Sequence, residues 1–251
     1  SDVMATGTTG SISLIGTAGN TLAAGIAVIN GTINARRNTN LTSDNVTIAN
    51  TASVGNATSG TVALSQRTDN TPINLGTETA GSLSYTSDEM NRIFANEIYI
   101  GRTTGGPMTV SASIAPANIS TTCRITLQSS SDLNFSGGSL TTLGGNVRLR
   151  ALHTYPNFSG TDISMNMGIL TFDPPGRYVN IVIDGSTANT NYTQLNVAGV
   201  VNISATNLFI TGNHTPTIGE TFIIINNDGT DPIQNGFNNV TEGQILNNFL
   251  G

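Results

Sequence analysis

The tripeptide Ile125-Thr-Leu127 returns further along the chain as Val147-Arg-Leu149, and this repeat decides how the chain is expected to fold. Both tripeptides alternate apolar and polar residues, as half-buried β-strands do. A second related pair, Val110-Ser-Ala112 and Leu133-Asn-Phe135, has nearly the same spacing. Similar segments that recur after one length of chain are typical of solenoids, in which each coil stacks on the previous one.

The same alternation runs along almost the whole chain, between turns rich in Gly, Asn, Asp and Ser. The first expected strands cover 11–15, 25–29, 45–49, 60–64, 81–85 and 96–100. The later ones cover 108–114, 124–128, 133–135, 146–149, 163–172, 178–183, 195–203, 208–210 and 221–225. The pattern predicts an all-β protein. Because the strands are so short, it favours a β-solenoid over the alternative, a β-sandwich.

The composition agrees with a narrow coil. Thr, Asn, Gly and Ser supply 119 of the 251 residues, whereas 10% of the residues are charged, 5% are aromatic and none is Trp. A narrow coil has little room for large side chains, and stacked polar ladders outside small aliphatic residues can order such a chain. Low charge with regularly spaced Val, Ile and Leu argues against disorder.

Coil length sets the expected organisation. At roughly 22 residues per coil, the chain makes on the order of eleven coils. We expect one rod, with solenoid coils over residues 1–175 and a closing segment over 176–251, where strands lengthen and aromatic residues become regular. Uncapped end coils are open strand edges, so we expect a rod cut from a longer chain or stacked end to end with its own copies.

One helical pattern interrupts the strands. Thr86 is followed three residues later by Glu89, which is a capping box, and Met90 and Ile93 fall on one side of a turn. This predicts one short helical turn near residues 86–93.

Charge and cysteine content exclude several classes of protein. The nine basic residues are all Arg and the net charge is −6, which argues against nucleic-acid binding. No run of apolar residues is long enough to span a membrane. The single cysteine, Cys123, excludes an internal disulfide and is expected to be a buried thiol. Because the chain begins at Ser1 without Met or a signal peptide, we expect an upstream region to have been removed.

Two stretches resemble bacterial surface proteins. The segment Gly81-Ser-Leu-Ser-Tyr-Thr-Ser-Asp-Glu-Met-Asn-Arg-Ile-Phe-Ala-Asn-Glu-Ile-Tyr-Ile-Gly101, with Gly106-Pro-Met-Thr-Val110 and Ile114, resembles a recurring unit of large secreted proteins such as filamentous haemagglutinin. The segment Tyr192-Thr-Gln-Leu-Asn-Val-Ala-Gly-Val-Val-Asn-Ile203, with 216–231 and 236–243, is similar to the closing segment of autotransporter-type adhesin passengers. Together these stretches cover about a third of the chain.

The resemblance implies a right-handed parallel β-helix that is exported and displayed on, or released from, a bacterial cell surface. It also implies adhesive or scaffolding work. Neither a secretion-signal domain nor an outer-membrane barrel accompanies the two stretches in this sequence, so the resemblance leaves the mode of anchoring open.

An enzyme is the contrasting hypothesis, because parallel β-helices also host polysaccharide lyases and hydrolases. Such sites need convergent carboxylates. Asp173 and Asp184 are eleven residues apart with Arg177 between them, and His153 and His214 lie in different neighbourhoods of the sequence. This spacing favours surface turns, so we expect no catalytic residues and no enzymatic activity.

A weak calcium-binding pattern lies near the C-terminus. Asn226, Asp228 and Asp231 place oxygen-bearing side chains around Gly229, but the downstream Glu of an EF-hand loop is missing. The segment 226–229 is also a typical turn. We therefore expect no cofactor or metal, with these three residues as the calcium candidates.

The surface carries two further patterns. Thr-x-Thr pairs are present without a regular repeat, which argues against ice binding. Arg148 and Arg150 share one face of an expected strand and are expected to be solvated, although a basic pair can also contact an acidic glycan.

The leading hypothesis is a non-enzymatic, structural and adhesive β-solenoid that is extracellular or on a bacterial surface. Its expected partners are glycans or proteins on host or neighbouring cells, and its own copies stacked end to end. The alternatives are a self-assembling filament or surface-layer subunit, and a polysaccharide-cleaving β-helix enzyme.

Overall fold

Short strands and one helical turn make up the described part of the chain. The computed structural model describes residues 3–5, 10–16, 25–35, 37–56, 60–118, 123–136, 138–142, 145–151, 153–155, 165–167, 170–172, 177–188, 190–192, 194–197, 200–204, 206–227, 231–241 and 243–244. Over these residues the protein is all-β with a single four-residue helix, which confirms the predicted class.

Two long sheets organise the molecule. The nine-stranded sheet has the order β2 (Ser11–Ile15), β5 (Asn38–Thr42), β8 (Thr61–Ser65), β12 (Glu97–Gly101), β14 (Arg124–Gln128), β16 (Asn146–Arg150), β19 (Leu170–Phe172), β22 (Val201–Asn202) and β25 (Ile233–Gln234). The seven-stranded sheet has the order β10 (Leu83–Thr86), β9 (Ile73–Gly76), β13 (Met108–Val110), β15 (Asp132–Phe135), β17 (His153–Tyr155), β20 (Arg177–Val182) and β23 (Thr206–Thr211).

Three shorter sheets complete the strand pairing. The four-stranded sheet has the order β1 (Val3–Ala5), β4 (Gly31–Ala35), β7 (Ala52–Gly55) and β11 (Ile93–Phe94). The three-stranded sheet contains β18 (Met165–Met167), β21 (Leu195–Val197) and β24 (Ile225–Asn227). The two-stranded sheet contains β3 (Ile26–Val28) and β6 (Val46–Ile48).

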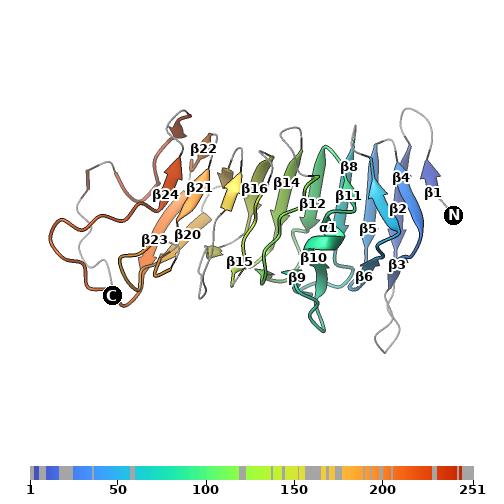
Figure 1. The fold of residues 1–251 in the computed structure, drawn as a ribbon, viewed down its shortest axis with the longest axis horizontal. Coiled ribbons are helices and arrows are strands. Elements are labelled where there is room, and N and C mark those ends of the chain that lie inside the picture. Colours follow the sequence, from blue (N-terminus) through green and yellow to red (C-terminus); the bar gives the residue numbers. More distant parts are fainter. Residues whose placement is uncertain are drawn as a thin grey trace.

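All pairings between these described strands are parallel. We call the chain from one strand of the nine-stranded sheet to the next a pass. Passes differ in length, from a short one between the paired residues Arg124 and Asn146 to a long one between Thr61 and Glu97. Figure 1 shows these strands side by side along the long axis of the molecule. Because most passes of the chain are longer than the expected coil, the sheet has nine strands where about eleven coils were expected.

Register aligns aliphatic side chains on one face of the nine-stranded sheet. Leu41, Leu64, Ile100, Leu127 and Leu149 occupy matching positions on successive strands. None of them is more than 2% exposed. Their outward neighbours are polar or small, as expected from the two-residue period of a strand. Burial of this aliphatic column therefore sets the register of the sheet.

The two repeats that predicted the fold differ in outcome. Ile125 pairs with Val147, as the first repeat requires. Val110 pairs with Phe135, so the second repeat, which matched Val110 with Leu133, is wrong by two positions. A shift of two positions keeps the same side chains facing inward, which is why the apolar pattern alone did not exclude it.

Several strands were not predicted, because their outward residues are polar. The strands β4, β5, β7 and β9 each combine one or two aliphatic residues with Gly, Thr, Asn or Ser, and their pairing with neighbouring strands stabilises them. The strand expected at 221–225 is wrong, because only Ile225 of it lies in a strand, β24. The segment expected at 108–114 ends earlier, at Val110.

The predicted helical turn is confirmed as α1 (Ser87–Met90), with the Thr86 and Glu89 capping box intact. α1 also covers the outer edge of β6. The Ile48 N–H donates to Glu89 Oε1 at 3.0 Å, and Arg92 Nη1 donates to the Ile48 carbonyl at 2.7 Å. These side chains bind the backbone groups of Ile48 as a neighbouring strand would.

The C-terminal part differs from the expectation of longer strands. Only β20 and β23 reach six residues, whereas β21, β22, β24 and β25 have two or three. At the outer edge of β23, the Leu208 N–H donates to Asn239 Oδ1 and Asn239 Nδ2 donates to the Leu208 carbonyl, both at 2.8 Å. The Asn238 N–H also donates to the Thr206 carbonyl. Residues 238–239 therefore close this edge of the seven-stranded sheet.

Candidate functional site

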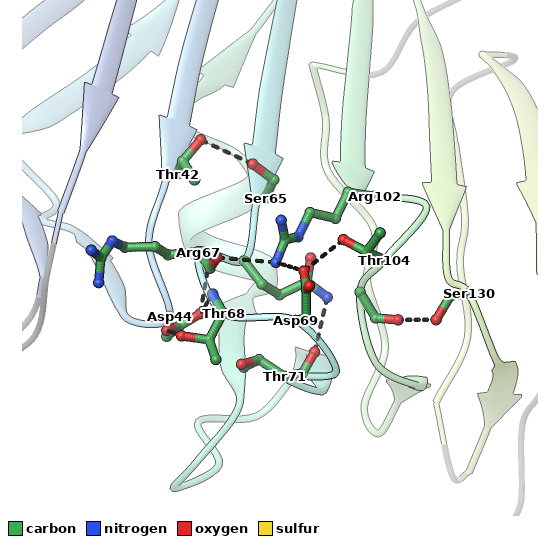
Figure 2. A network of polar contacts seen from close by, with 12 residues as sticks. Thr42, Asp44, Ser65, Arg67, Thr68, Asp69, Thr71, Arg102, Thr104 and Ser130 are labelled. Atoms are coloured by element: carbon green, nitrogen blue, oxygen red, sulfur yellow. Dashed lines mark hydrogen bonds and ion pairs between the residues drawn. The ribbon is translucent and has the colours of Figure 1, made fainter.

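Successive turns of the chain form a polar stack along one side of the molecule. We define the turn stack as residues 43–45, 66–71, 102–106 and 129–131, which follow β5, β8, β12 and β14. Figure 2 shows hydrogen bonds passing from each turn to the next. They include Asp44 with Thr68, Asp69 with Thr104, and Ser130 with Gly105. Thr42 and Ser65, at the ends of β5 and β8, form a further hydrogen bond just before the first two turns.

Asp44 anchors the first of these contacts. Its Oδ1 accepts hydrogen bonds from the backbone N–H groups of Arg67 and Thr68 at 2.9 Å, and its Oδ2 accepts one from the Thr68 hydroxyl. Partial burial opposes ionisation of the Asp44 carboxyl, but these hydrogen bonds outweigh it and lower the pKa below its usual value. Asp44 is therefore a fixed negative charge at neutral pH.

Asp69 makes the next contact, at a more exposed position. Arg102 Nη2 lies 2.7 Å from Asp69 Oδ1, and the Thr104 hydroxyl donates to the same oxygen at 2.7 Å. Arg102 also donates to the Arg67 carbonyl at 3.0 Å. Since the Asp69 side chain is 66% exposed, this ion pair orients the turn and adds little stability.

A six-residue loop, 77–82, projects beside the turn stack. It joins β9 to its parallel neighbour β10, and side chains of both strands hold it. Asn74 Nδ2 donates to the hydroxyls of Thr77 and Thr79 at 2.9 and 2.8 Å. The Thr79 N–H donates to Ser84 Oγ at 3.1 Å. Asn74 and Ser84 are buried beneath the loop, so its position is fixed by the sheet.

A pocket of about 520 Å³ lies between the turn stack and the 77–82 loop. One wall contains Asp44, Asn45 and Thr71, and the other runs from Glu78 to Ser82. Burial raises the pKa of the Glu78 carboxyl, and the neighbouring Glu89 raises it further. The pocket thus joins a carboxylate that is held ionised with a carboxyl that retains its proton to higher pH.

This arrangement suits binding better than catalysis. Two carboxyl groups with opposite pKa shifts are the usual components of acid–base chemistry. Asp44, however, accepts three hydrogen bonds from the next turn, and because they lower its pKa the carboxylate is a weak base for taking a proton from a substrate or water. The remaining lining consists of hydroxyl, amide and backbone groups.

The calcium candidates are only partly placed by the structure. Asn226 lies in β24 rather than in the expected turn, which is therefore wrong at this residue. Asp231 is exposed, and its backbone carbonyl accepts a hydrogen bond from the Asn227 amide. Asp228 lies outside the described residues. Calcium binding at Asn226, Asp228 and Asp231 stays a prediction.

Of the residues weighed for catalysis, only Asp184 and His214 have described side chains, so the pairing of Asp173 with Asp184 and of His153 with His214 stays untested. Asp184 accepts hydrogen bonds from the backbone and side chain of Asn213. His214 Nε2 lies 2.9 Å from Glu220 Oε1, a contact within one loop. Asp173 and the side chains of Arg177 and His153 lie outside the described part of the structure.

Two other expectations concern single side chains. Cys123 is buried, as expected, and burial raises the pKa of its thiol to about 11. Arg148 and Arg150 are half-buried on β16, so they are only partly solvated. Arg150 reaches across β14 and donates to the Tyr99 hydroxyl at 3.2 Å.

The sequence analysis missed the pocket residues Asp44, Thr71 and Glu78. A usable sequence pattern was present, because Asp44 and Asp69 are separated by close to one pass of the chain, and each follows a strand. Glu78 carried no such pattern. The position of Glu78 depends on β9 and on the short 77–82 connection from β9 to β10. Neither this strand nor this connection was predicted.

Neither a metal centre nor a membrane helix is found in the described residues. No group of three His, Cys, Asp or Glu side chains there is arranged to hold a metal ion. No helix in the same part of the chain is long and apolar enough to cross a membrane. Comparisons with protein-family models, curated proteins and solved structures find no match to this chain.

Proposed function

We propose that the chain is a right-handed parallel β-helix that serves as a non-enzymatic structural and adhesive rod. The observation that carries this proposal is the parallel, in-register pairing of successive passes along the nine-stranded sheet. A sandwich of antiparallel sheets would pair its strands differently. The inward aliphatic column and the outward polar turn stack are the features expected of such a rod.

The proposed place of action is outside the cell, on a bacterial surface or in the secreted fraction. A surface of Thr, Asn, Gly and Ser with few charges agrees with this location, as do the two stretches that resemble haemagglutinin-like and autotransporter-type proteins. The proposed partners are glycans or proteins on host or neighbouring cells. Stacked turns offer them many shallow polar contacts along the rod.

Two measurements test this function. Electron microscopy of the purified chain should show narrow rods. Beads coated with the chain should adhere to cells, whereas beads coated with the heat-unfolded chain should not. Compact particles would contradict the β-helix, and equal adhesion of the two kinds of bead would contradict an adhesive role of the folded rod.

A second candidate function is a self-assembling filament or surface-layer subunit, built by stacking copies end to end. Its support is a hollow of about 810 Å³ near the C-terminal end, which is lined by apolar residues together with Asn235, Thr241 and Gln244. Its apolar lining includes Ile203, Phe222, Ile225, Ile233, Phe237 and Val240. Two residues of this lining, Ile223 and Ile233, are 52% and 44% exposed. Sedimentation should show concentration-dependent polymers if a second copy covers this hollow, and a monomer at every concentration would count against it.

A further inference from the structure

The pocket between the turn stack and the 77–82 loop has a lining that restricts its ligand. Six residues supply polar groups to it: Asp44, Asn45, Thr71, Glu78, Thr79 and Ser82. Its volume of about 520 Å³ is in the range of small-molecule sites. Hydroxyl and amide groups at both walls match a ligand that carries several hydroxyl groups of its own.

The charges of the lining point to a cationic group on that ligand. Asp44 is ionised at neutral pH and Glu78 adds a second carboxyl group on the opposite wall. None of the described residues that line the pocket is basic. An anionic ligand would be repelled, whereas an ammonium group would be attracted to both walls.

The rigidity of the walls supports a site of defined shape. Asp44 is held by three hydrogen bonds from the following turn, and the opposite loop is held through Asn74 and Ser84. A Cβ added at Gly81, on the loop wall, would meet no atom within 4 Å, so space beside this wall is open.

We propose that this pocket binds an amino sugar, with its free ammonium group between Asp44 and Glu78 and its hydroxyl groups on the Thr and Ser side chains. The inference deepens the proposed adhesive function, on which it rests, by naming the chemistry that a cell-surface glycan must present.

Titration followed by calorimetry or NMR tests the ligand class with three related sugars. Glucosamine carries the ammonium group, whereas N-acetylglucosamine and glucose have similar rings without it. We expect glucosamine to bind at least about fivefold more tightly than either neutral sugar, the ratio that about 1 kcal/mol of ion pairing supplies. Equal binding of the three sugars, or no binding of glucosamine, would overturn the inference.

Variants test the location of the site. Glu78→Gln removes a charge at an exposed loop position and should weaken glucosamine binding about threefold to fivefold. Asp88→Asn, an exposed acid on α1 outside the pocket, makes the same change in net charge and should leave binding unchanged. Asp44→Asn should weaken binding further, and circular dichroism would check that its turn still folds. Equal affinities of the Glu78→Gln and Asp88→Asn variants would refute this location.

Adhesion assays separate this inference from the function on which it rests. If Glu78→Gln beads adhere to cells as wild-type beads do while neither protein binds glucosamine, the pocket inference fails and the adhesive rod stands. If wild-type beads do not adhere but the protein binds glucosamine through Glu78, the adhesive function fails and the ligand assignment stands. Release of new reducing ends from amino-sugar oligomers would contradict the non-enzymatic function.

Discussion

Replacement of Glu89 by Ala tests how the edge of β6 is closed. Glu89 Oε1 accepts the Ile48 N–H at 3.0 Å, and Oε2 accepts the Thr86 N–H at the same distance. Glu89 is 6% exposed and Ile48 is 1% exposed, so water has little access to either group. The Glu89→Ala variant therefore leaves a buried backbone donor without an acceptor at Ile48.

The expected loss of stability follows from these contacts. A buried donor without a partner costs about 1–3 kcal/mol, and the broken capping box of α1 costs about 1 kcal/mol more. The free energy of unfolding should therefore fall by about 2–4 kcal/mol. For a chain of this size, that corresponds to a decrease in Tm of about 4–16 °C.

Denaturant unfolding and amide hydrogen exchange would measure the effect. The matched control is Asp88→Ala, which removes an exposed carboxylate from the same helix and should change the free energy of unfolding by less than about 0.5 kcal/mol. In the Glu89→Ala variant, the Ile48 amide should exchange faster than amides in the middle of the nine-stranded sheet. Equal destabilisation by the two variants, or an Ile48 amide protected as in the wild type, would refute the reasoning.

Three further substitutions or modifications have defined outcomes. Thr39→Val should raise the free energy of unfolding by about 1 kcal/mol in denaturant titrations, because the buried Thr39 hydroxyl has no hydrogen-bond partner in the described structure; a loss of stability would contradict this. Asn239→Ala should speed hydrogen exchange at the Leu208 amide and cost about 1 kcal/mol, and unchanged exchange would exclude an edge-closing role. Burial raises the thiol pKa of Cys123 to about 11, against a usual value of 9.0. A thiol reagent at pH 8 should therefore label native protein about a hundredfold more slowly than urea-unfolded protein. Equal labelling rates would show an exposed thiol.

The apolar pattern predicted the inner face of the fold better than its strand boundaries. Ile125, Leu127, Val147 and Leu149 fall on the inward face that their alternation predicts. This succeeds because burial of aliphatic residues acts on every strand in the same way. The spacing of coils is less predictable, since loops of different length, such as 77–82, are inserted between strands without changing the inward column.

The pocket depends on contacts between successive turns of the chain, which no local sequence pattern predicts. Asp44 reaches the backbone of Arg67 and Thr68 on the following turn of the chain. Glu78 faces that turn only because β10 returns beside β9 after six residues. Parallel neighbours usually need a longer connection, so nothing in the sequence alone favoured this return.

Side chains rather than strands close two sheets of this protein, which bears on how copies could associate. At β6 the Glu89 carboxylate and the Arg92 guanidinium bind the backbone of Ile48, and at β23 the Asn239 amide binds that of Leu208. A strand from a second copy could pair with β23 only by displacing Asn239, which would lose two hydrogen bonds before it gained any. End-to-end assembly at the C-terminal end would therefore proceed through the hollow that β24 and β25 help to line, and substitutions there should weaken it more than substitutions on β23.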